Sequence, residues 1–387
     1  MDLEKGFLGA IRWSPYLQQA PERKMDGTVS KSPTILITRL SHIGDCVLTL
    51  PMLDRVKQIY PTSKIVWAVE SPTQQLLSLV PEIDHIVKVP KSWMSNWRHW
   101  RSLRKELLSH KIDIAIDPQG ITKSAALAWI SGAPKRIGLQ GRWGRELSTW
   151  LNNQLVDTES LHIVDRSVEL VNAMATTDQN EFHTREFDFK LPVCRDSQTK
   201  ISQWLAENQN GGFETESFVL INPGGSWASK RWEVDRFGEL AAEIKNQFGL
   251  PSVIVWAGDE EQKMASQIVA DSNGSAMMAC PTTLRELAAL AERASFFVGS
   301  DTGPMHIATA VGTPCVGLYG TTRPEESGAY GDQHQAIQKW YQAGSCRQRR
   351  SAANDAMRDI TVADVIEACR KLHTKSMGVT AAVDKVA

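Results

Sequence analysis

SFFVGSDTGPMHIATAVGTPCVGLYG, residues 295–320, contains the pattern from which the architecture of the chain follows. An apolar run stops at Gly299, and small and apolar residues resume at helical spacing in MHIATAVG, so the pattern predicts a strand, a tight turn and a helix. The next apolar run, PCVGLYG, again ends in glycine. Strand, helix and strand within so few residues indicate a parallel sheet, whose ligands bind at the carboxyl ends of its strands.

The turn Ser300–Pro304 has residue types that suit an anion site. Asp301 or Thr302 can cap the first N–H groups of the helix, Gly303 lets a ligand approach the backbone, and Pro304 fits a first helical turn. The N-terminus of such a helix stabilises a diphosphate without a metal. Similar junctions occur in every doubly wound domain, and most of them bind no ligand. Spacing alone therefore leaves both interpretations open.

Length and composition restrict the class of protein. A chain of 387 residues has room for two domains that each bury a core. Lys and Arg total 43 against 44 Asp and Glu, which argues against a general nucleic-acid-binding surface. Six cysteines without paired metal-ligand spacing suggest reduced thiols in the cytoplasm. No apolar segment reaches the roughly 18 residues of a membrane span, and the N-terminus lacks a signal-peptide core, so a cytoplasmic protein is expected.

Apolar runs alternate with helical patterns along the first half. Residues 1–32 show no periodicity and are expected to form a loosely ordered extension. Strands are predicted at TILITRL (34–40), KIVWAVE (64–70), HIVKVP (85–90) and DIAIDPQG (113–120). After the first strand, SHIGD interrupts the chain before CVLTLPMLDRVKQIY (46–60) begins a helix. FDFKLP (187–192) is expected to close the first sheet or to start the crossing to the second half.

Polar side chains follow two of these strands. Asp45 is either an N-cap, worth about 1 kcal/mol, or a general base at the carboxyl end of the first strand; position alone favours the cap. Asp117 and Gln119 end another strand and should lie in the same cleft. Lys123 either reaches that cleft or is a solvated lysine in a first helical turn.

The segment Lys88–Lys105 has six Lys or Arg and no Asp or Glu. Its tryptophans are Trp93, Trp97 and Trp100, and its helical basic residues are Arg98, Arg101, Arg104 and Lys105. Helical spacing places the three rings on roughly one face. The commoner outcome is an amphipathic helix that packs its rings on the sheet. The alternative is a basic, aromatic lip for an anionic, lipid-like substrate at a membrane surface, and the local charge favours this lip.

The second half repeats the alternation. FVLINPGGSWASKRW (218–232) places a strand before a glycine-rich loop in which Lys230 is available as a flexible cation for phosphate. Glu261 lies just past the following strand and could accept hydrogen bonds from ribose hydroxyls, as carboxylates do in dinucleotide folds; an ordinary first-turn glutamate is the alternative. DITVADVIEACRKL (359–372) is expected to form the last helix, followed by a frayed tail.

Four motifs follow one another in the order RLSHIGDCVLTLPML (39–53), IDPQGITKSAALAWISG (116–132), NPGGSWASKRW (222–232) and VGSDTGPMHIATAVGTPCVGLYGTTRP (298–324). Together they resemble glycosyltransferase family 9, the heptosyltransferases of lipopolysaccharide inner-core assembly, over about residues 34–372. Within that family the sequence looks closest to heptosyltransferase I. One departure is His42, which stands where heptosyltransferase I commonly has a serine near the donor phosphates.

The resemblance implies an α/β GT-B architecture, in which two facing Rossmann-like domains with parallel sheets border a cleft. Residues 33–195 would form the acceptor domain, residues 196–375 the donor domain, and residues 376–387 the tail. The implied reaction moves a heptose or related sugar, with inversion, from an ADP-sugar to a lipopolysaccharide core or similar glycolipid. It implies no cofactor and no essential metal. The basic, aromatic segment adds the expectation of a peripheral contact with the inner face of the membrane, and the balanced charge adds that of no nucleic-acid binding.

Residue roles carry over by position in the motifs. Asp45 matches the catalytic aspartate. The donor side comprises Ser41, Lys230, Glu261, Asp301, Thr302, Gly303 and His306. The acceptor side comprises Asp117, Gln119 and Lys123, together with Arg98 and Arg101 of the basic segment. His306 is expected either to donate to a phosphate or to pack as a core histidine under the turn.

Three other functions remain open at this point. One is a family 9 transferase with a different nucleotide-sugar or acceptor. Another is a catalytically silent nucleotide-sugar-binding protein, which would keep the donor residues and need nothing at Asp45. The last is a nucleotide-sugar epimerase of the same two-domain shape, although no second acid-base pair stands out.

Overall fold

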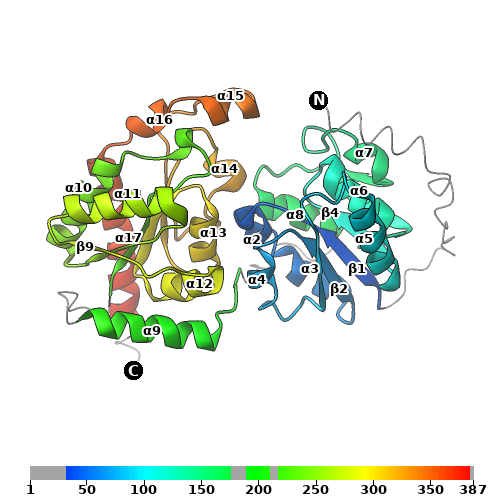
Figure 1. Cartoon of the computed structure of the whole chain (residues 1–387), viewed down its shortest axis with the longest axis horizontal. Coiled ribbons are helices and arrows are strands. Elements are labelled where there is room, and N and C mark those ends of the chain that lie inside the picture. The colour runs from blue at the N-terminus through cyan, green and yellow to red at the C-terminus, as the bar shows by residue number, and fades with distance from the viewer. Residues whose placement is uncertain (1–31, 176–188, 210–216, 384–387) are drawn as a thin grey trace. The chain divides into compact units, whose positions relative to one another are not determined.

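The computed structural model describes residues 32–175, 189–209 and 217–383, and it divides the chain into two compact units, Met1–Asp188 and Phe189–Ala387 (Figure 1). Each unit contains one six-stranded parallel sheet with helices, as the sequence predicted. The predicted N-terminal extension lies outside the described residues except for Ser32. The functional division at residue 195 stays a prediction.

The first sheet has the strand order of a dinucleotide-binding fold. Its strands are β1 (Thr34–Thr38), β2 (Lys64–Val69), β3 (His85–Lys88), β4 (Ile114–Asp117), β5 (Lys135–Leu139) and β6 (Gln154–Val156). They pair in the order β3-β2-β1-β4-β5-β6, with every pair parallel. The order reverses between β1 and β4, and ligands of doubly wound sheets bind at the carboxyl ends of the strands at this switch point.

The helices of the first unit are α2 (Ile43–Leu48), α3 (Met52–Ile59), α4 (Gln74–Leu77), α5 (Trp97–Ser109), α6 (Thr122–Ile130), α7 (Ser148–Leu151) and α8 (Ile163–Asn172). The prediction of one continuous helix over residues 46–60 was wrong. Pro51 cannot donate the backbone hydrogen bond that would continue a helix, and α3 starts directly after it. Apolar residues of α5 and α6, including Leu107 and Leu127, pack with Leu36 and Val66 of the sheet.

The second sheet repeats the first in its strand order. It contains β7 (Val219–Asn222), β8 (Ser252–Ile254), β9 (Ala276–Met278), β10 (Phe296–Ser300), β11 (Cys315–Leu318) and β12 (Gln335–Ile337). The order β12-β11-β10-β7-β8-β9 is again entirely parallel. Its switch point lies between β7 and β10, and β10 is the strand predicted before the Ser300–Pro304 turn.

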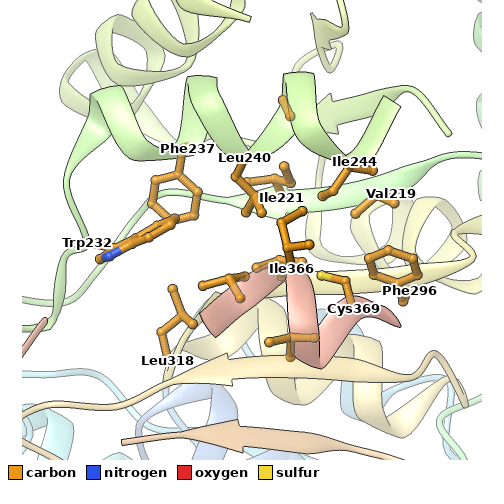
Figure 2. Close-up of a cluster of buried hydrophobic side chains, with 14 of the residues drawn as sticks. Val219, Ile221, Trp232, Phe237, Leu240, Ile244, Phe296, Leu318, Ile366 and Cys369 are labelled. Atoms are coloured by element: carbon orange, nitrogen blue, oxygen red, sulfur yellow. The ribbon is translucent and has the colours of Figure 1, made fainter. Parts of the chain in front are cut away.

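The remaining helices are α9 (Arg195–Gln209), the 3₁₀ helix η3 (Ala228–Lys230), α10 (Val234–Phe248), α11 (Gly258–Asp271), α12 (Leu284–Arg293), α13 (Gly303–Ala310), α14 (Pro324–Ser327), α15 (Cys346–Ser351), α16 (Asp355–Arg358) and α17 (Val362–Val383). Figure 2 shows Phe237 and Leu240 of α10 in the same apolar cluster as Ile366 and Cys369 of α17. Helix α10 ends at Gly249, whose φ of 71° lies in the left-handed region that glycine favours.

Two expectations for chain segments differ from the structure. Phe187 and Asp188 lie outside the described residues, and the described remainder of FDFKLP, residues 189–192, is not in a strand. Instead, the N–H of Leu191 donates to the carbonyl of Ala310 at 2.7 Å, so a backbone contact with α13 fixes this segment within the second unit. Helix α17 continues to Val383, beyond the point where the sequence suggested a frayed tail.

His334 should make the stability of the second unit depend on pH. Burial lowers the pKa of His334 to about 4, and its Nδ1 accepts a hydrogen bond from the N–H of Cys315 at 3.0 Å. Because the unfolded chain has the ordinary histidine pKa of about 6.5, the stabilising contribution is complete above that pH. It is lost as the pH falls from about 6.5 to about 4, at a slope of up to about 1.4 kcal/mol per pH unit.

The measurement is thermal unfolding of the wild type and of His334→Gln at pH 7.5 and at pH 4.5. The wild type should lose about 2–3 kcal/mol more stability between these pH values than the variant, since only the wild type binds an extra proton on unfolding. Equal acid sensitivity of the two proteins would contradict this assignment.

Candidate functional site

Asp45 lies at the switch point of the first sheet, in the first turn of α2. The N-cap position belongs to His42, so the N-cap interpretation of Asp45 was wrong. Its Oδ2 is 2.8 Å from Nη2 of Arg39, the residue after β1, and 3.7 Å from Nδ1 of His42. The Asp45 side chain is one-third exposed, whereas Arg39 is buried. A buried guanidinium thus orients a carboxylate that solvent still reaches.

The loop after β4 fixes the loop after β1. The carbonyl of Pro118 accepts a hydrogen bond from Nη1 of Arg39 at 2.9 Å. Gln119 accepts from the N–H of Leu40 at 2.9 Å through Oε1 and donates to Oγ of Ser41 at 3.3 Å through Nε2. The structure therefore brings Gln119 into contact with Ser41, in the loop that leads to Asp45, and the cleft predicted to hold Gln119 and Asp45 together stays a prediction.

Asp117 has a different place from the other acceptor-side residues. Its side chain is fully buried, and its carboxylate accepts from the N–H groups of Gln119 and Gly120 and from Nδ2 of Asn152 at 3.0–3.2 Å. Burial raises the pKa of Asp117, and these hydrogen bonds oppose the increase. Asp117 therefore shapes the loop that carries Gln119, and its predicted acceptor-side role stays a prediction.

Lys123 lies in the first turn of α6 and forms an ion pair, so it is not the unpaired, solvated lysine of the second alternative. Its Nζ forms an ion pair with Oε1 of Glu70, which follows β2 and is buried, and it lies 3.4 Å from the carbonyl of Lys91. The carboxyl edge of the first sheet therefore carries two ion pairs, Arg39–Asp45 and Lys123–Glu70. Sequence reasoning missed both partners, Arg39 and Glu70.

The tryptophans of the basic segment do not share a face. The Asn96 side chain caps α5 by accepting from the N–H of Arg98, so the helix begins at Trp97 and Trp93 precedes it, fully buried. Trp100 packs against the core, whereas Trp97 is 67% exposed. Arg104 lies over the Trp100 ring and donates to the carbonyl of Ile130. The segment is thus mainly a packed helix, and its solvent-facing part carries Trp97, Arg98 and Arg101.

Exchanging Arg98 and Arg101 for glutamine is expected to weaken binding to anionic lipid more than binding to ADP. Both side chains are exposed, and a basic residue near an anionic surface contributes about 1 kcal/mol. Co-sedimentation with anionic and neutral vesicles measures the first quantity and calorimetry with ADP the second. The pair Lys263→Gln and Arg293→Gln, which removes the same charge from exposed positions, is the control. If binding to anionic vesicles and binding to ADP weakened equally, the segment would have a structural role and would not bind lipid.

The second switch point contains a buried charge cluster. Asp301, which follows β10, accepts from Nζ of Lys230 at 2.9 Å through Oδ2 and lies 3.0 Å from Nε2 of His306 through Oδ1. The Lys230 ammonium also donates to the Asp301 carbonyl at 2.7 Å. Burial would raise the pKa of Asp301, but Lys230 and His306 outweigh burial and hold it well below its usual range.

The structure corrects one expectation for this cluster and favours one of two alternatives for another. Lys230 was predicted to be a flexible cation, yet it is 8% exposed and fixed by Asp301. His306 is 3% exposed and its Nε2 faces Asp301, so the structure places it as a core histidine under the turn, one of the two alternatives. The positive charge of Lys230 lies at the N-terminus of α13 but is already partly neutralised there.

The N-terminus of α13 has no side-chain cap. Thr302 occupies the N-cap position, but its hydroxyl donates to the carbonyl of Ser300 at 3.1 Å and accepts from Nδ2 of Asn222 at 3.1 Å. Neither Thr302 nor Asp301 therefore caps the helix, contrary to prediction. Gly303 and Pro304 are partly exposed, so an anion can approach this end of the helix.

The glycine-rich loop after β7 lies against Glu261. A Cβ atom on Gly224 would stand 2.2 Å from Oε1 of Glu261, so a larger residue there would displace this carboxylate. Oε2 of Glu261 accepts from the N–H of Ala257 at 2.9 Å, and burial raises the pKa of Glu261. Glu261 thus supports the start of α11 and also borders the loop that leads to Lys230.

An aromatic ring between cations lies next to this loop and was missed from sequence. The Trp227 ring lies 4.7 Å from Nζ of Lys230 and 5.1 Å from Cζ of Arg350. The Ser229 hydroxyl donates to the carbonyl of Arg349, which connects the loop to α15. The run CRQRRS carried a visible charge signal, but it lies about 120 residues from the loop in sequence.

A family model for glycosyltransferase family 9 (heptosyltransferase) matches residues 100–357. The chain belongs to this glycosyltransferase family. The family 9 match covers β4 and the turn of Asp117 in the first unit, and it extends in the second unit from β7 through the Lys230–Asp301 cluster to α15. The resemblance that the four motifs indicated is thereby confirmed, and the chain is a glycosyltransferase.

Similar family 9 proteins come from several bacteria. The lipopolysaccharide core heptosyltransferase OpsX of Haemophilus influenzae is 26% identical over 301 residues, 77% of this chain and 82% of that protein. Lipopolysaccharide heptosyltransferase 1 of Pseudomonas aeruginosa is 25% identical over 306 residues, 77% of this chain and 81% of that protein.

Solved family 9 structures share the fold. A glycosyl transferase family 9 protein from Veillonella parvula superposes with a TM-score of 0.72 at 21% identity, covering 89% of this chain and all of that one. The Escherichia coli heptosyltransferase WaaC, solved with ADP-2-deoxy-2-fluoro heptose, has a TM-score of 0.67 at 21% identity, covering 87% and 99% of the two chains. The predicted α/β, GT-B fold class is confirmed. None of the described helices combines the length and apolar character that a bilayer crossing requires.

Proposed function

We propose that this family 9 chain is an inverting, metal-independent heptosyltransferase that takes its sugar from an ADP-sugar and transfers it to a lipopolysaccharide inner core or similar glycolipid. The second unit would bind the donor and the first unit the acceptor. Support comes from the similar lipopolysaccharide heptosyltransferases, among them WaaC, whose structure contains ADP-2-deoxy-2-fluoro heptose. The observation that carries most weight is that Asp45 follows β1 and that Asp301, paired with Lys230, follows β10, which are switch-point strands of two sheets of identical order.

Asp45 is the proposed general base. Its carboxylate is partly exposed and is held by Arg39, so a hydroxyl group can reach it from solvent. As the hydroxyl oxygen attacks the anomeric carbon from the face opposite the nucleotide, its proton passes to Asp45. A single displacement of this kind inverts the anomeric centre. Arg39 acts as a positioning residue, since it touches the base and not the reacting atoms.

The leaving diphosphate is proposed to lie at the start of α13. Negative charge grows on its oxygen as the glycosidic bond breaks, and the partly exposed, uncapped helix N-terminus offers N–H groups and a positive dipole. Lys230 adds a charge fixed next to the turn. These two groups take the electrostatic role that a cation fills in metal-dependent transferases. Glu261, beside the glycine-rich loop, is the proposed partner of the ribose hydroxyls.

The test is incubation of the purified chain with ADP-, GDP- and UDP-sugars, with and without a deacylated core acceptor, followed by separation of products. We expect ADP release from ADP-heptose that rises on addition of acceptor and is unchanged by EDTA, together with an inverted anomeric configuration in the product. Faster turnover of a GDP- or UDP-sugar would assign another family 9 donor specificity. Loss of activity in EDTA, with the chain still folded by circular dichroism, would overturn metal independence.

A catalytically silent nucleotide-sugar binder is the alternative from a different class. It would bind ADP in calorimetry but release none from any donor in the presence of acceptor. The intact Arg39–Asp45 pair at the first switch point argues against it, because a binder has no use for an oriented, accessible carboxylate there.

We further propose that the protein is cytoplasmic and contacts the membrane peripherally through Trp97, Arg98 and Arg101, because its glycolipid acceptor lies in the membrane.

A further inference from the structure

Three side chains of metal-ligand type converge at the amino-terminal edge of the first sheet. His85 is the first residue of β3, Glu106 lies in the last turn of α5, and His110 is the C-cap residue of that helix. One ligand atom from each lies within 4.8 Å of the other two. It is the one such group of three among the described residues, and it stands at the edge opposite the strand ends that position Asp45.

The spacing follows from the secondary structure. Glu106 and His110 are four residues apart, which places them on one face of the helix, as in metal-binding helices that use residues i and i+4. Helix α5 follows β3 and packs against it, so its C-terminal end returns to the residue where β3 starts. His85 is thereby brought to this pair from a distant position in sequence.

The distances suit a small transition-metal ion. His85 Nε2 lies 3.7 Å from Glu106 Oε1, and the two imidazole rings lie 4.4 Å apart at 44°. Ligand atoms on a tetrahedral zinc stand roughly 3.3–3.6 Å apart, because Zn–N and Zn–O bonds are about 2.0–2.2 Å. Small rotations of partly exposed side chains would complete this geometry. An ion pair between His85 and Glu106 alone would give the His110 imidazole no role, whereas a metal ion would use it as a third ligand.

We infer that His85, Glu106 and His110 form a binding site for Zn²⁺ or a similar first-row divalent ion. Two imidazoles and one carboxylate supply three ligands, and water supplies the fourth. The ion would connect β3, an edge strand of four residues, to the C-terminal end of α5. Its role would be to stabilise the fold around the basic helix. The site is independent of the proposed function and compatible with metal-independent sugar transfer.

The experiment uses the full-length chain without a histidine tag, freed of metal with EDTA and dialysed. Co²⁺ titration should produce visible absorption bands that saturate at one equivalent and disappear when Zn²⁺ is added. Zn²⁺ should also raise the midpoint of thermal unfolding. His85→Asn and His110→Asn should each weaken Zn²⁺ binding more than tenfold, since losing even an outer-shell partner costs about 10–100-fold.

His99→Asn is the matched control, because His99 lies on the same helix, away from the group, and contacts Ser92. It should bind metal as the wild type does. Should either histidine variant fail to fold, Glu106→Gln tests the same site with a change that preserves size. The inference is overturned if the wild type takes up no stoichiometric Co²⁺ or Zn²⁺, or if His99→Asn loses as much affinity as the other variants.

Discussion

Asp45→Asn is expected to reduce turnover by about 10²–10⁴-fold, the usual effect of removing a general base. The amide keeps the size of the side chain and can still accept a hydrogen bond from Arg39, so the fold and the affinity for ADP should stay near wild type. Turnover is measured as ADP release with saturating donor and acceptor, and affinity by calorimetry. Lower turnover with unchanged ADP affinity is the result expected for a general base, whereas loss of a binding group would weaken ADP affinity.

The control is Asp235→Asn, which removes an exposed carboxylate from the first turn of another helix, α10. Both variants lose the favourable interaction of a first-turn carboxylate with its helix dipole, about 0.3–1 kcal/mol. Only Asp45→Asn should lose turnover. A lower unfolding temperature with turnover near wild type would instead give Asp45 a purely structural role in α2.

Lys230→Met is expected to destabilise the second unit by about 3–5 kcal/mol and to abolish measurable ADP binding. The substitution removes the ammonium from the Asp301 carboxylate, which is 6% exposed and keeps only its contacts with His306 and Ser327, and breaking a buried ion pair has this cost. It also removes the charge proposed to face the diphosphate. Thermal unfolding and calorimetry with ADP measure the two effects, and Lys263→Met, at an exposed site on α11, should change neither.

The double variant Lys230→Met, Asp301→Asn separates these effects. Because it removes both charges of the pair, it should recover much of the lost stability. ADP binding should remain weak, since the cation is still missing. A stable double variant that binds ADP as well as the wild type does would restrict Lys230 to a structural role and would remove it from the proposed donor site.

Much of the fold was predictable because buried parallel strands have continuous apolar runs. Strands β1 and β10 stand out for this reason, and the helices after them begin at recognisable turns. Strands β6 and β12, each three residues long at a sheet edge, have no such run and were missed. The start of α5 was misplaced although Asn96, a good N-cap, marked it.

Candidate site residues were predictable individually, but their pairings were not. The motifs identified Asp45, Lys230 and Asp301 because they follow strands or lie in a glycine-rich loop. The partners Arg39, Glu70 and Asn222 are also at strand ends, yet which ends meet depends on sheet order, which a single sequence does not reveal. The same limit explains why Lys230 was expected to be flexible: its burial depends on Asp301, 71 residues away.

Each six-stranded sheet is built from an uninterrupted length of chain, residues 34–156 for one and 219–337 for the other. During synthesis, the nascent polypeptide can therefore complete its earlier sheet while the later one is still being translated, because each strand pairs only with strands of its own sheet. Such sequential maturation limits the time during which open sheet edges are exposed on the ribosome, where they would invite aggregation.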